Sequence, residues 1–364
     1  MRFYFLPLVI AITCITTACA SSGDRSVVFQ RCLDKCTRQS CTATTANANA
    51  NNGSRDRSSS VTPPAMRAQQ QEQPMMPLAL RLTRWTCADN CKYTCMHALT
   101  DLAEESGVRM EQYYGKWPFW RYAGMQEPAS VAFSVANLLM HVLGADWLRR
   151  GVHPAHPMRP FYRTWAYVSI NAWVWSAVFH TRDTPLTEKL DYFSAALVIL
   201  YALYMTGVRL FHLYPGTPAF PGRSGRRRAF FHSWRAIAAV AYVAHISYLG
   251  MAQRFDYTYN VMFNLILGLI HHVLWLQFAL PGSSPLARYA AMPGSYRPAH
   301  AGTAAMTVAL TTAATAFELF DFPPWARVLD AHALWHLATA PLAVLWYDFL
   351  ITDAQDAGWR GQRQ

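Results

Sequence analysis

Seven long apolar segments fill the last two-thirds of the chain and restrict it to one class of architecture. Each segment is close to the ~20 residues that an α-helix needs to cross a lipid bilayer. Lipid offers no hydrogen-bond partners to the backbone, so crossing segments of this length must be helices. The sequence therefore predicts an all-α membrane domain over residues 129–351, with seven transmembrane helices at roughly 129–148, 164–181, 190–208, 230–249, 258–280, 302–320 and 331–351.

The N-terminal residues have the features of a secretory signal peptide. Arg2 is followed by an apolar stretch, and the small residues Ala18 and Ala20 form a cleavage site. We expect cleavage after Ala20, which removes residues 1–20 and places residues 21–128 in the lumen of the secretory pathway. The alternative is that this stretch remains as an uncleaved first membrane helix.

The cysteines predict a disulfide-rich lumenal domain. Cys14 and Cys19 lie in the predicted signal peptide, and six others precede the first apolar segment: Cys32, Cys36, Cys41, Cys87, Cys91 and Cys95. An even number in an oxidising compartment predicts three disulfides, although six cysteines allow 15 pairings. Cys87, Cys91 and Cys95 recur every four residues, so they would share one face of a helix. A zinc knuckle is the competing interpretation, which the absence of C-x2-C pairs disfavours.

A low-complexity segment at 42–78 separates the cysteines into two triplets. It consists mainly of Ala, Asn, Ser, Arg, Gln and Pro. A segment of this composition cannot bury a core, so we expect a disordered insertion in the lumenal domain. Asn52 begins a glycosylation sequon within it. Because many sequons are not used, the glycosylation of Asn52 is left open.

The basic residues between the apolar segments predict the orientation of the chain. The loops 149–163, 209–228 and 281–301 carry four, five and two arginines, respectively, and no acidic residue. The alternate loops are balanced in charge. By the positive-inside rule the arginine-rich loops are cytosolic, which gives a lumenal N-terminus and a cytosolic tail at 352–364. Membrane topology thus explains the net charge of +11, which need not indicate a nucleic-acid partner.

This topology brings five polar residues to the lumenal ends of three helices. Ser176 and His180 are one turn apart near the end of the second helix, and His332 and His336 are one turn apart at the start of the seventh. Asp191 opens the third helix. Ionisable side chains at membrane depth are costly and are usually kept for function. The five residues therefore predict a functional site at this membrane face.

The residue types point to a metal-dependent hydrolase. Three histidines can bind zinc and leave one position for water, whose pKa the metal lowers to about 7. The hypothesis is that His180, His332 and His336 bind Zn2+, Asp191 is the general base, and Ser176 donates a hydrogen bond to the water or to the oxyanion. Each residue also has an ordinary interpretation. An H-x3-H pair arises readily among 13 histidines, His180 can be an interfacial residue, Ser176 can bond within its own helix, and Asp191 can cap the third helix.

Several runs of residues resemble the Per-like family, the post-GPI-attachment-to-proteins factors that remodel the lipid of GPI anchors. The run WTCADNCKYTCM (85–96) resembles the lumenal cysteine signature of that family. The other similar runs are GKWPFWRYAGMQEPASVAFSVANL (115–138), NAWVWSAVFHTRDTPLTEKLDYFSA (171–195), FDYTYN (255–260), and ELFDFPP with LDAHALWH (318–336). They occur in order along the chain, so the resemblance covers the lumenal and the membrane domains.

The resemblance implies a place in a wider superfamily that includes alkaline ceramidases and adiponectin-type receptors. In that superfamily, residues of helices 2, 3 and 7 form a zinc amidase or esterase site, which corresponds here to Ser176, His180, Asp191, His332 and His336. Glu127 matches a glutamate at the start of helix 1, and its role is left open. The family implies hydrolysis of the sn-2 acyl ester of GPI-anchored proteins in the endoplasmic reticulum or Golgi membrane. The insertion at 42–78 departs from the family pattern and leaves the shape of the lumenal domain in doubt.

These observations together predict a multi-pass membrane hydrolase, a phospholipase A2-type enzyme whose partners are GPI-anchored proteins. One alternative is a ceramidase-like amidase with the same chemistry on another lipid. Another is a non-enzymatic receptor or escort of GPI-anchored proteins with a structural zinc ion. Seven transmembrane helices would exclude a soluble nucleic-acid-binding protein.

Overall fold

The computed structural model describes residues 21–41, 76–214, 225–282 and 284–359. The predicted signal peptide, most of the predicted insertion and Asn52 lie outside these residues. The chain divides into two compact units. We call Glu127–Phe322 with Val328–Gln364 the helical unit, and Cys19–Gln126 with Pro323–Arg327 the cystine unit.

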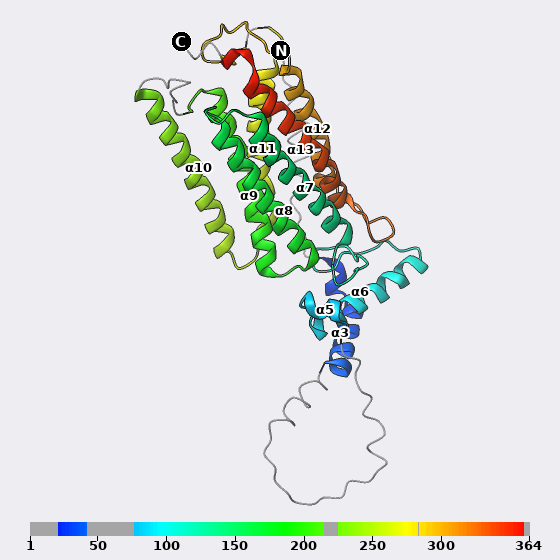
Figure 1. The fold of residues 1–364 in the computed structure, drawn as a ribbon. Helices are drawn as coiled ribbons and strands as arrows, with labels where there is room; N and C mark the ends of the chain where they lie inside the picture. Colours follow the sequence, from blue (N-terminus) through cyan, green and yellow to red (C-terminus); the bar gives the residue numbers. More distant parts are fainter. Residues whose placement is uncertain (1–20, 42–75, 215–224, 283, 360–364) are drawn as a thin grey trace, which may run out of the picture. The chain divides into compact units, whose positions relative to one another are not determined.

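Seven long helices make up the described part of the helical unit, and each overlaps one of the predicted segments (Figure 1). Four of them, α7, α9, α11 and α13, are long and apolar enough to cross a membrane. The helical unit is therefore that of a multi-pass membrane protein, and membrane crossing by the other three stays a prediction. The helices are α7 (Pro128–Gly151), α8 (Arg159–Thr181), α9 (Pro185–Leu210), α10 (Gly225–Met251), α11 (Tyr257–Ala279), α12 (Ala301–Leu319) and α13 (Ala331–Gln355).

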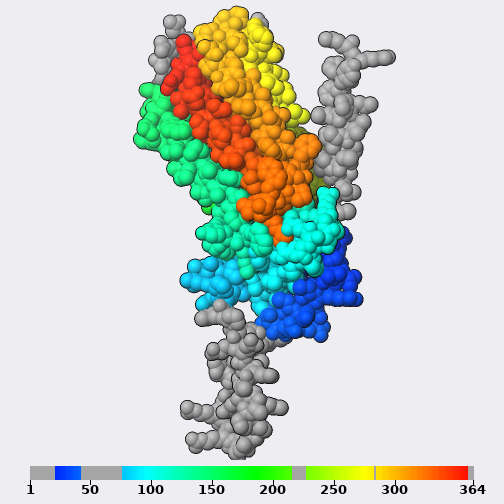
Figure 2. Space-filling model, turned by 90° about the vertical axis from the view of Figure 1, so that its right-hand side faces the viewer, coloured from blue at the N-terminus to red at the C-terminus, as the bar shows by residue number. Residues whose placement is uncertain are grey.

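Six of these helices pack in a closed ring, and α10 packs on its outside. Around the ring, α7 contacts α8, α8 contacts α9, α9 contacts α11, α11 contacts α12, and α12 contacts α13, which returns to α7. On the face shown in Figure 2, α13 (red) lies between α7 (green) and α12 (orange). The main neighbour of α10 is α9. The ring thus places α7, α8, α12 and α13 around a shared interior.

Capping residues determine where α9 and α13, two of the helices that carry the predicted site, begin. Thr184 caps α9 in a capping box with Thr187, and Pro185 occupies the first helical position. Asp191 consequently lies in the second turn of α9, and the interpretation of Asp191 as a helix cap is wrong. Asp330 caps α13 by accepting a hydrogen bond from the Ala333 amide. Burial raises the pKa of the Asp330 carboxyl, and the bond from Ala333 opposes that shift.

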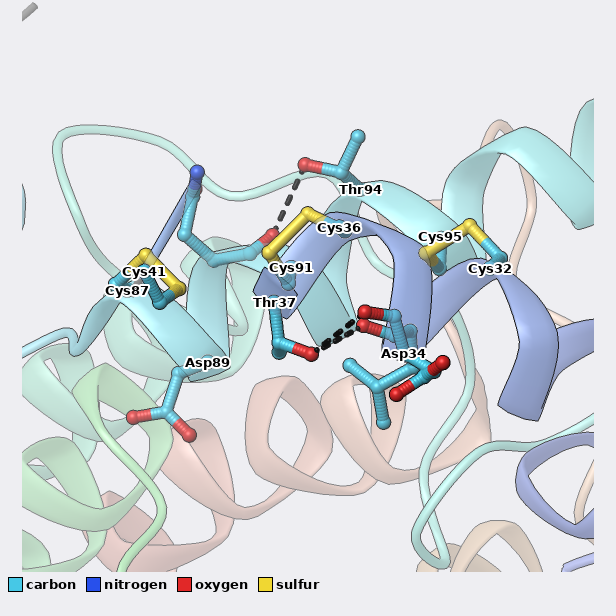
Figure 3. Close-up of a disulfide and its surroundings, with 12 residues drawn as sticks. Cys32, Asp34, Cys36, Thr37, Cys41, Cys87, Asp89, Cys91, Thr94 and Cys95 are labelled. Atoms are coloured by element: carbon cyan, nitrogen blue, oxygen red, sulfur yellow. Dashed lines mark hydrogen bonds between the residues drawn. A yellow bond between two sulfur atoms is a disulfide. The ribbon is translucent and has the colours of Figure 1, made fainter. Parts of the chain in front are cut away.

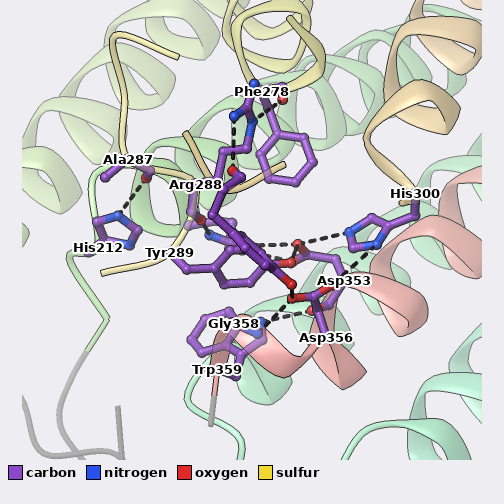
Figure 4. Close-up of polar contacts among 12 residues, drawn as sticks. His212, Phe278, Ala287, Arg288, Tyr289, His300, Asp353, Asp356, Gly358 and Trp359 are labelled. Carbon is purple, nitrogen blue, oxygen red and sulfur yellow. Dashed lines mark hydrogen bonds and ion pairs between the residues drawn. The ribbon is translucent and has the colours of Figure 1, made fainter. Parts of the chain in front are cut away.

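A buried polar network ties the segment between α11 and α12 to the last turns of α9 and α13 (Figure 4). Arg209 donates from Nε and Nη2 to the two carboxylate oxygens of Asp353, at 2.7 Å each, and the Tyr289 hydroxyl donates to Asp353 at 2.9 Å. Arg288 donates to a backbone carbonyl in the last turn of α11 and to backbone carbonyls of its own segment. Arg209 and Arg288, which the loop pattern predicts to be cytosolic loop charges, are both buried, and these acceptors satisfy their guanidinium groups.

Three disulfides hold two antiparallel helices of the cystine unit together (Figure 3). The helices are α3 (Val27–Ser40) and α6 (Cys87–Glu105), which follow the short α2 (Ser22–Arg25) and α5 (Leu78–Leu82), respectively. The pairs are nested: Cys32–Cys95, Cys36–Cys91 and Cys41–Cys87. The three disulfides and the helical spacing of the second cysteine triplet are confirmed, and the zinc-knuckle alternative is wrong.

The segment Pro323–Arg327, which connects α12 to α13, belongs to the cystine unit. The Arg327 guanidinium donates to both carboxylate oxygens of Glu104, at 3.1 and 2.7 Å, and forms an ion pair with Asp101. It also lies 3.1 Å from His97 Nδ1. The other ring nitrogen of His97 donates to the Phe119 carbonyl, so Nδ1 accepts from Arg327 and the ring is neutral. Burial lowers the pKa of His97, in agreement with this assignment.

Replacing Cys36 and Cys91 with serine is expected to weaken the pairing of α3 with α6. A native disulfide in a small secreted domain contributes about 2–5 kcal/mol, here by closing a chain separation of 55 residues. In hydrogen exchange of the purified full-length protein, amides of α3 and α6 should exchange at least ~10-fold faster than in wild type. The control is Thr94→Ser at an exposed position of α6. Equal exchange in the double-serine variant would contradict a stabilising role for this disulfide.

Candidate metal centre

Three histidines from two helices meet at one end of the helical unit. His180 is in the last turn of α8, and His332 and His336 are in the first two turns of α13. One ring nitrogen from each lies within 4.8 Å of the other two. The Nε2 atoms of His180 and His332 are 3.3 Å apart. The structure thus confirms the predicted convergence of these histidines in a group that could hold a metal ion.

A buried carboxylate orients His180. Glu127 precedes the first residue of α7, and its Oε2 lies 2.7 Å from Nδ1 of His180. The backbone amide of Glu127 also donates to the carbonyl of His180 at 3.0 Å. The two side chains are 7% and 2% exposed, respectively. Glu127, whose role the sequence left open, therefore fixes both the ring and the backbone of His180.

A second carboxylate lies beside His332. Oε2 of Glu318, in the last turn of α12, is 2.7 Å from Nδ1 of His332. Both side chains are 38% exposed, in contrast to the buried pair of Glu127 and His180. The Glu318–His332 pair therefore lies at the edge of the cluster.

Polar groups of α7 surround the third histidine. Nδ1 of His336 lies 3.0 Å from the Ser134 hydroxyl and 3.4 Å from the Ser130 carbonyl. The Asn137 amide donates to the backbone carbonyl of His336 at 2.6 Å. The ring of Trp173, on α8, packs edge-on against the imidazole. These contacts hold His336 in one orientation inside the ring of helices.

The outer partners leave one nitrogen of each ring available as a metal ligand. A carboxylate only accepts hydrogen bonds, so Nδ1 of His180 and of His332 carries a proton, and in the neutral ring Nε2 carries a lone pair. The Ser130 carbonyl favours the same tautomer in His336. Histidine ligands of zinc characteristically donate their other nitrogen to a carboxylate or a carbonyl. In a tetrahedral site with Zn–N distances of 2.0–2.1 Å, two ligand nitrogens are about 3.3 Å apart, as Nε2 of His180 and of His332 are. The donor set therefore fits a zinc ion.

The two remaining predicted residues lie differently with respect to the histidines. Ser176 is buried, and its hydroxyl is 3.0 Å from that of Ser134, which links it to His336. This contact favours a role at the site over bonding within its own helix. Asp191 is half-buried in the second turn of α9. Among the described residues, Glu127 and Glu318 each place a carboxylate oxygen 2.7 Å from a ring nitrogen of a histidine, and the general-base role of Asp191 stays a prediction.

Ser130, Ser134 and Glu318 contact the histidines but are not among the residues that the sequence predicts for the site. A signal for the two serines exists, because buried polar residues recur on α7 every three or four positions, at Glu127, Ser130, Ser134, Asn137 and His141. Such a polar stripe in an apolar helix predicts a face that lines an interior site. No comparable pattern marks Glu318, which comes from a different helix.

The fold and the site define a class: multi-pass, all-helical membrane proteins with a buried histidine cluster able to hold a metal ion. The chain belongs to the Per1-like family, whose sequence profile matches residues 77–354.

Three relatives illustrate the extent of this similarity. The chain is 35% identical over 347 residues to the human GPI-specific phospholipase A2-like PGAP3 (Homo sapiens), covering 95% of this chain and 93% of the relative. It is 35% identical over 350 residues to the PER1 homolog of Schizosaccharomyces pombe, covering 96% and 92%. It is 36% identical over 343 residues to post-GPI attachment to proteins factor 3 of Drosophila melanogaster, covering 94% and 92%. No solved structure matches the chain.

Proposed function

We propose that this protein is a zinc-dependent hydrolase that removes the sn-2 acyl chain from the lipid of GPI-anchored proteins. The observation that carries the proposal is the meeting of His180, His332 and His336, with Nε2 of the first two facing each other at 3.3 Å. The substrate class follows from relatives that bear the name GPI-specific phospholipase A2-like and align over nearly their whole length. The proposed location is the membrane of the endoplasmic reticulum or the Golgi apparatus.

Each residue of the site has a task in ester hydrolysis. His180, His332 and His336 would hold the zinc ion, which when bound acidifies water and polarises a carbonyl group. Asp191 would accept the proton of the attacking water. Ser176 would donate a hydrogen bond to the oxyanion that develops on the ester carbonyl. Water adds to the acyl carbon and the bond to the glycerol oxygen breaks, which yields a fatty acid and a lyso-GPI.

The position of the histidines suits a lipid ester. They lie at the end of α8 and the start of α13, which would place them near one boundary of the membrane rather than at its centre. The acyl chains of a GPI lipid lie in the bilayer, while its glycan and protein lie outside it. The ester bond that joins an acyl chain to the rest of the GPI lipid would therefore lie at about the depth of the histidines.

Lipid analysis of cells that carry His332→Ala with His336→Ala tests the substrate. GPI lipids of the variant cells should retain their original sn-2 chain, while those of wild-type cells should lose it. A change in ceramide or other sphingolipids with unchanged GPI lipids would contradict the proposal and favour the ceramidase-like alternative.

An Asp191→Asn variant separates an enzyme from a receptor or escort with structural zinc. We expect it to fold, keep its metal and lose about 10²–10⁴-fold in hydrolysis, because the amide cannot take a proton from water. The assay is fatty-acid release from a purified GPI-anchored protein, with zinc content measured on the same sample. The control is Glu188→Gln, one turn earlier on α9, whose carboxylate accepts from Tyr257. Unchanged hydrolysis in Asp191→Asn would remove Asp191 from the mechanism.

A further inference from the structure

We propose that Glu318 positions His332 for metal binding, and that α12 thereby contributes to the site. The inference rests on the proposed function, since it assigns Glu318 a task toward the proposed zinc ion. Glu318 opens the run ELFDFPP, which contains none of the five predicted site residues. It lies 14 residues before His332 in the chain and on a separate helix.

The contact between Glu318 and His332 determines where the imidazole proton lies. Oε2 of Glu318 is 2.7 Å from Nδ1 of His332, and a carboxylate can only accept. A proton is therefore on Nδ1, and in the neutral ring Nε2 of His332 carries a lone pair, 3.3 Å from Nε2 of His180. Two facing lone pairs at this distance would repel each other, so the contact needs either a proton or a metal ion between the two nitrogens.

Without Glu318, the two rings could satisfy each other without a metal ion. If the proton of His332 moved to Nε2, that nitrogen would donate a hydrogen bond to Nε2 of His180 across the same 3.3 Å. His180 cannot make the corresponding change, because Glu127 holds the proton on its Nδ1. Glu318 therefore favours the tautomer of His332 that can bind a metal ion over the tautomer that would donate a hydrogen bond to His180.

Helix stability does not explain the position of Glu318. It is the next-to-last residue of α12, at the end where exposed carbonyl groups give the helix a partial negative charge. A carboxylate in the last turn is therefore unfavourable for the helix itself. The compensation is the bond to His332, together with the attraction that the carboxylate would have to a zinc ion at the proposed site.

The exposure of the pair distinguishes Glu318 from Glu127. The Glu127–His180 pair is almost completely buried, so it also holds α7 against α8. The Glu318–His332 pair is 38% exposed on both sides, and its loss leaves no buried charge without a partner. A variant of Glu318 should therefore alter metal binding while the helical unit remains folded.

Zinc affinity of the purified full-length protein tests this assignment. Competition with a chelator should show zinc bound about 10–100-fold more weakly by Glu318→Gln than by wild type, because the amide can donate as well as accept and no longer selects the tautomer. The visible spectrum of the Co2+-loaded variant should also differ from that of wild type. Glu318→Asp should recover part of the affinity. Glu188→Gln, at a carboxylate bonded to Tyr257, should bind zinc as wild type does.

The outcomes separate this inference from the proposed function. The unfolding temperature of the zinc-free Glu318→Gln protein should equal that of wild type, so that weaker zinc binding is not a consequence of unfolding. Wild-type zinc affinity and an unchanged Co2+ spectrum in Glu318→Gln would overturn the role of Glu318 alone. A wild-type protein that binds no zinc would overturn the proposed metal site together with this inference.

Discussion

Alanine at His336 should reduce the release of fatty acid from a GPI-anchored protein by at least about a thousandfold, equivalent to about 4 kcal/mol of barrier. His336 is the more buried of the two proposed ligands on α13, and its removal leaves only two of the three nitrogens that would hold zinc. Ser130 and Ser134 would lose their contact with the ring but are small and remain close to each other through their own helical bond. The effect is measured as the rate of fatty-acid release by the purified protein, with the products followed by mass spectrometry.

The matched control for this prediction is another histidine of the helical unit. His272 lies on α11, and its Nδ1 is 3.2 Å from the hydroxyl of Thr312 on α12. His272→Ala removes an imidazole of the same kind away from the proposed site and should retain a rate within a few-fold of wild type. If His336→Ala hydrolysed the lipid as fast as His272→Ala does, the histidine cluster would have no part in the reaction.

The second large effect is on stability and arises at the other ends of α9 and α13. In Asp353→Asn, the Arg209 guanidinium keeps its charge but loses the carboxylate that balances it, and both side chains are at most 1% exposed. Breaking a buried ion pair by removing one partner costs about 3–5 kcal/mol. For a chain of this size that corresponds to a fall of about 10 °C in the unfolding temperature. Thermal unfolding in detergent measures this shift.

Two further variants show whether the buried charge is the cause. Asp146→Asn removes a carboxylate of α7 whose arginine partners are well exposed, and it should change the unfolding temperature by less than about 2 °C. Arg209→Met combined with Asp353→Leu removes both charges and should recover part of the lost stability. If the Asp353→Asn protein were as stable as wild type, this network would not stabilise the helical unit.

The existence and length of the helices could be predicted, but their arrangement could not. An apolar segment of about 20 residues indicates a transmembrane helix whether its neighbours are lipid or protein, because both environments are apolar. Hydropathy therefore cannot show that α10 lies outside the ring and that α11 packs directly on α9. The same limit applies to Arg209 and Arg288, because a loop arginine and a buried structural arginine look alike in a sequence.

The disulfides illustrate the same division. The number of bridges followed from six cysteines in a predicted oxidising compartment, whereas their pairing depended on tertiary structure. Once α3 and α6 are known to lie antiparallel, the nested pairing is the one in which the cysteines of the two helices face each other in order. The antiparallel packing of these two helices, which the predicted insertion separates in the chain, cannot be read from the local sequence.

The histidine cluster was predictable because two local features act together. The spacing of His332 and His336 puts both on one helical face, and the predicted topology put His180 at the same end of the bundle. The outer partners were not predictable in this way. Glu318 reaches His332 from another helix, and this contact depends on how α12 packs against α13. The sequence therefore predicted the three histidines of the cluster, but not the contacts that orient their rings.

Metal analysis of the purified protein tests the central claim most directly. Wild-type protein and His272→Ala should each contain one zinc ion per chain, and His180→Ala should contain none, because it lacks the nitrogen that faces His332 at 3.3 Å. Wild-type protein without bound metal after purification in zinc-containing buffer, or His180→Ala with as much zinc as wild type, would contradict the account.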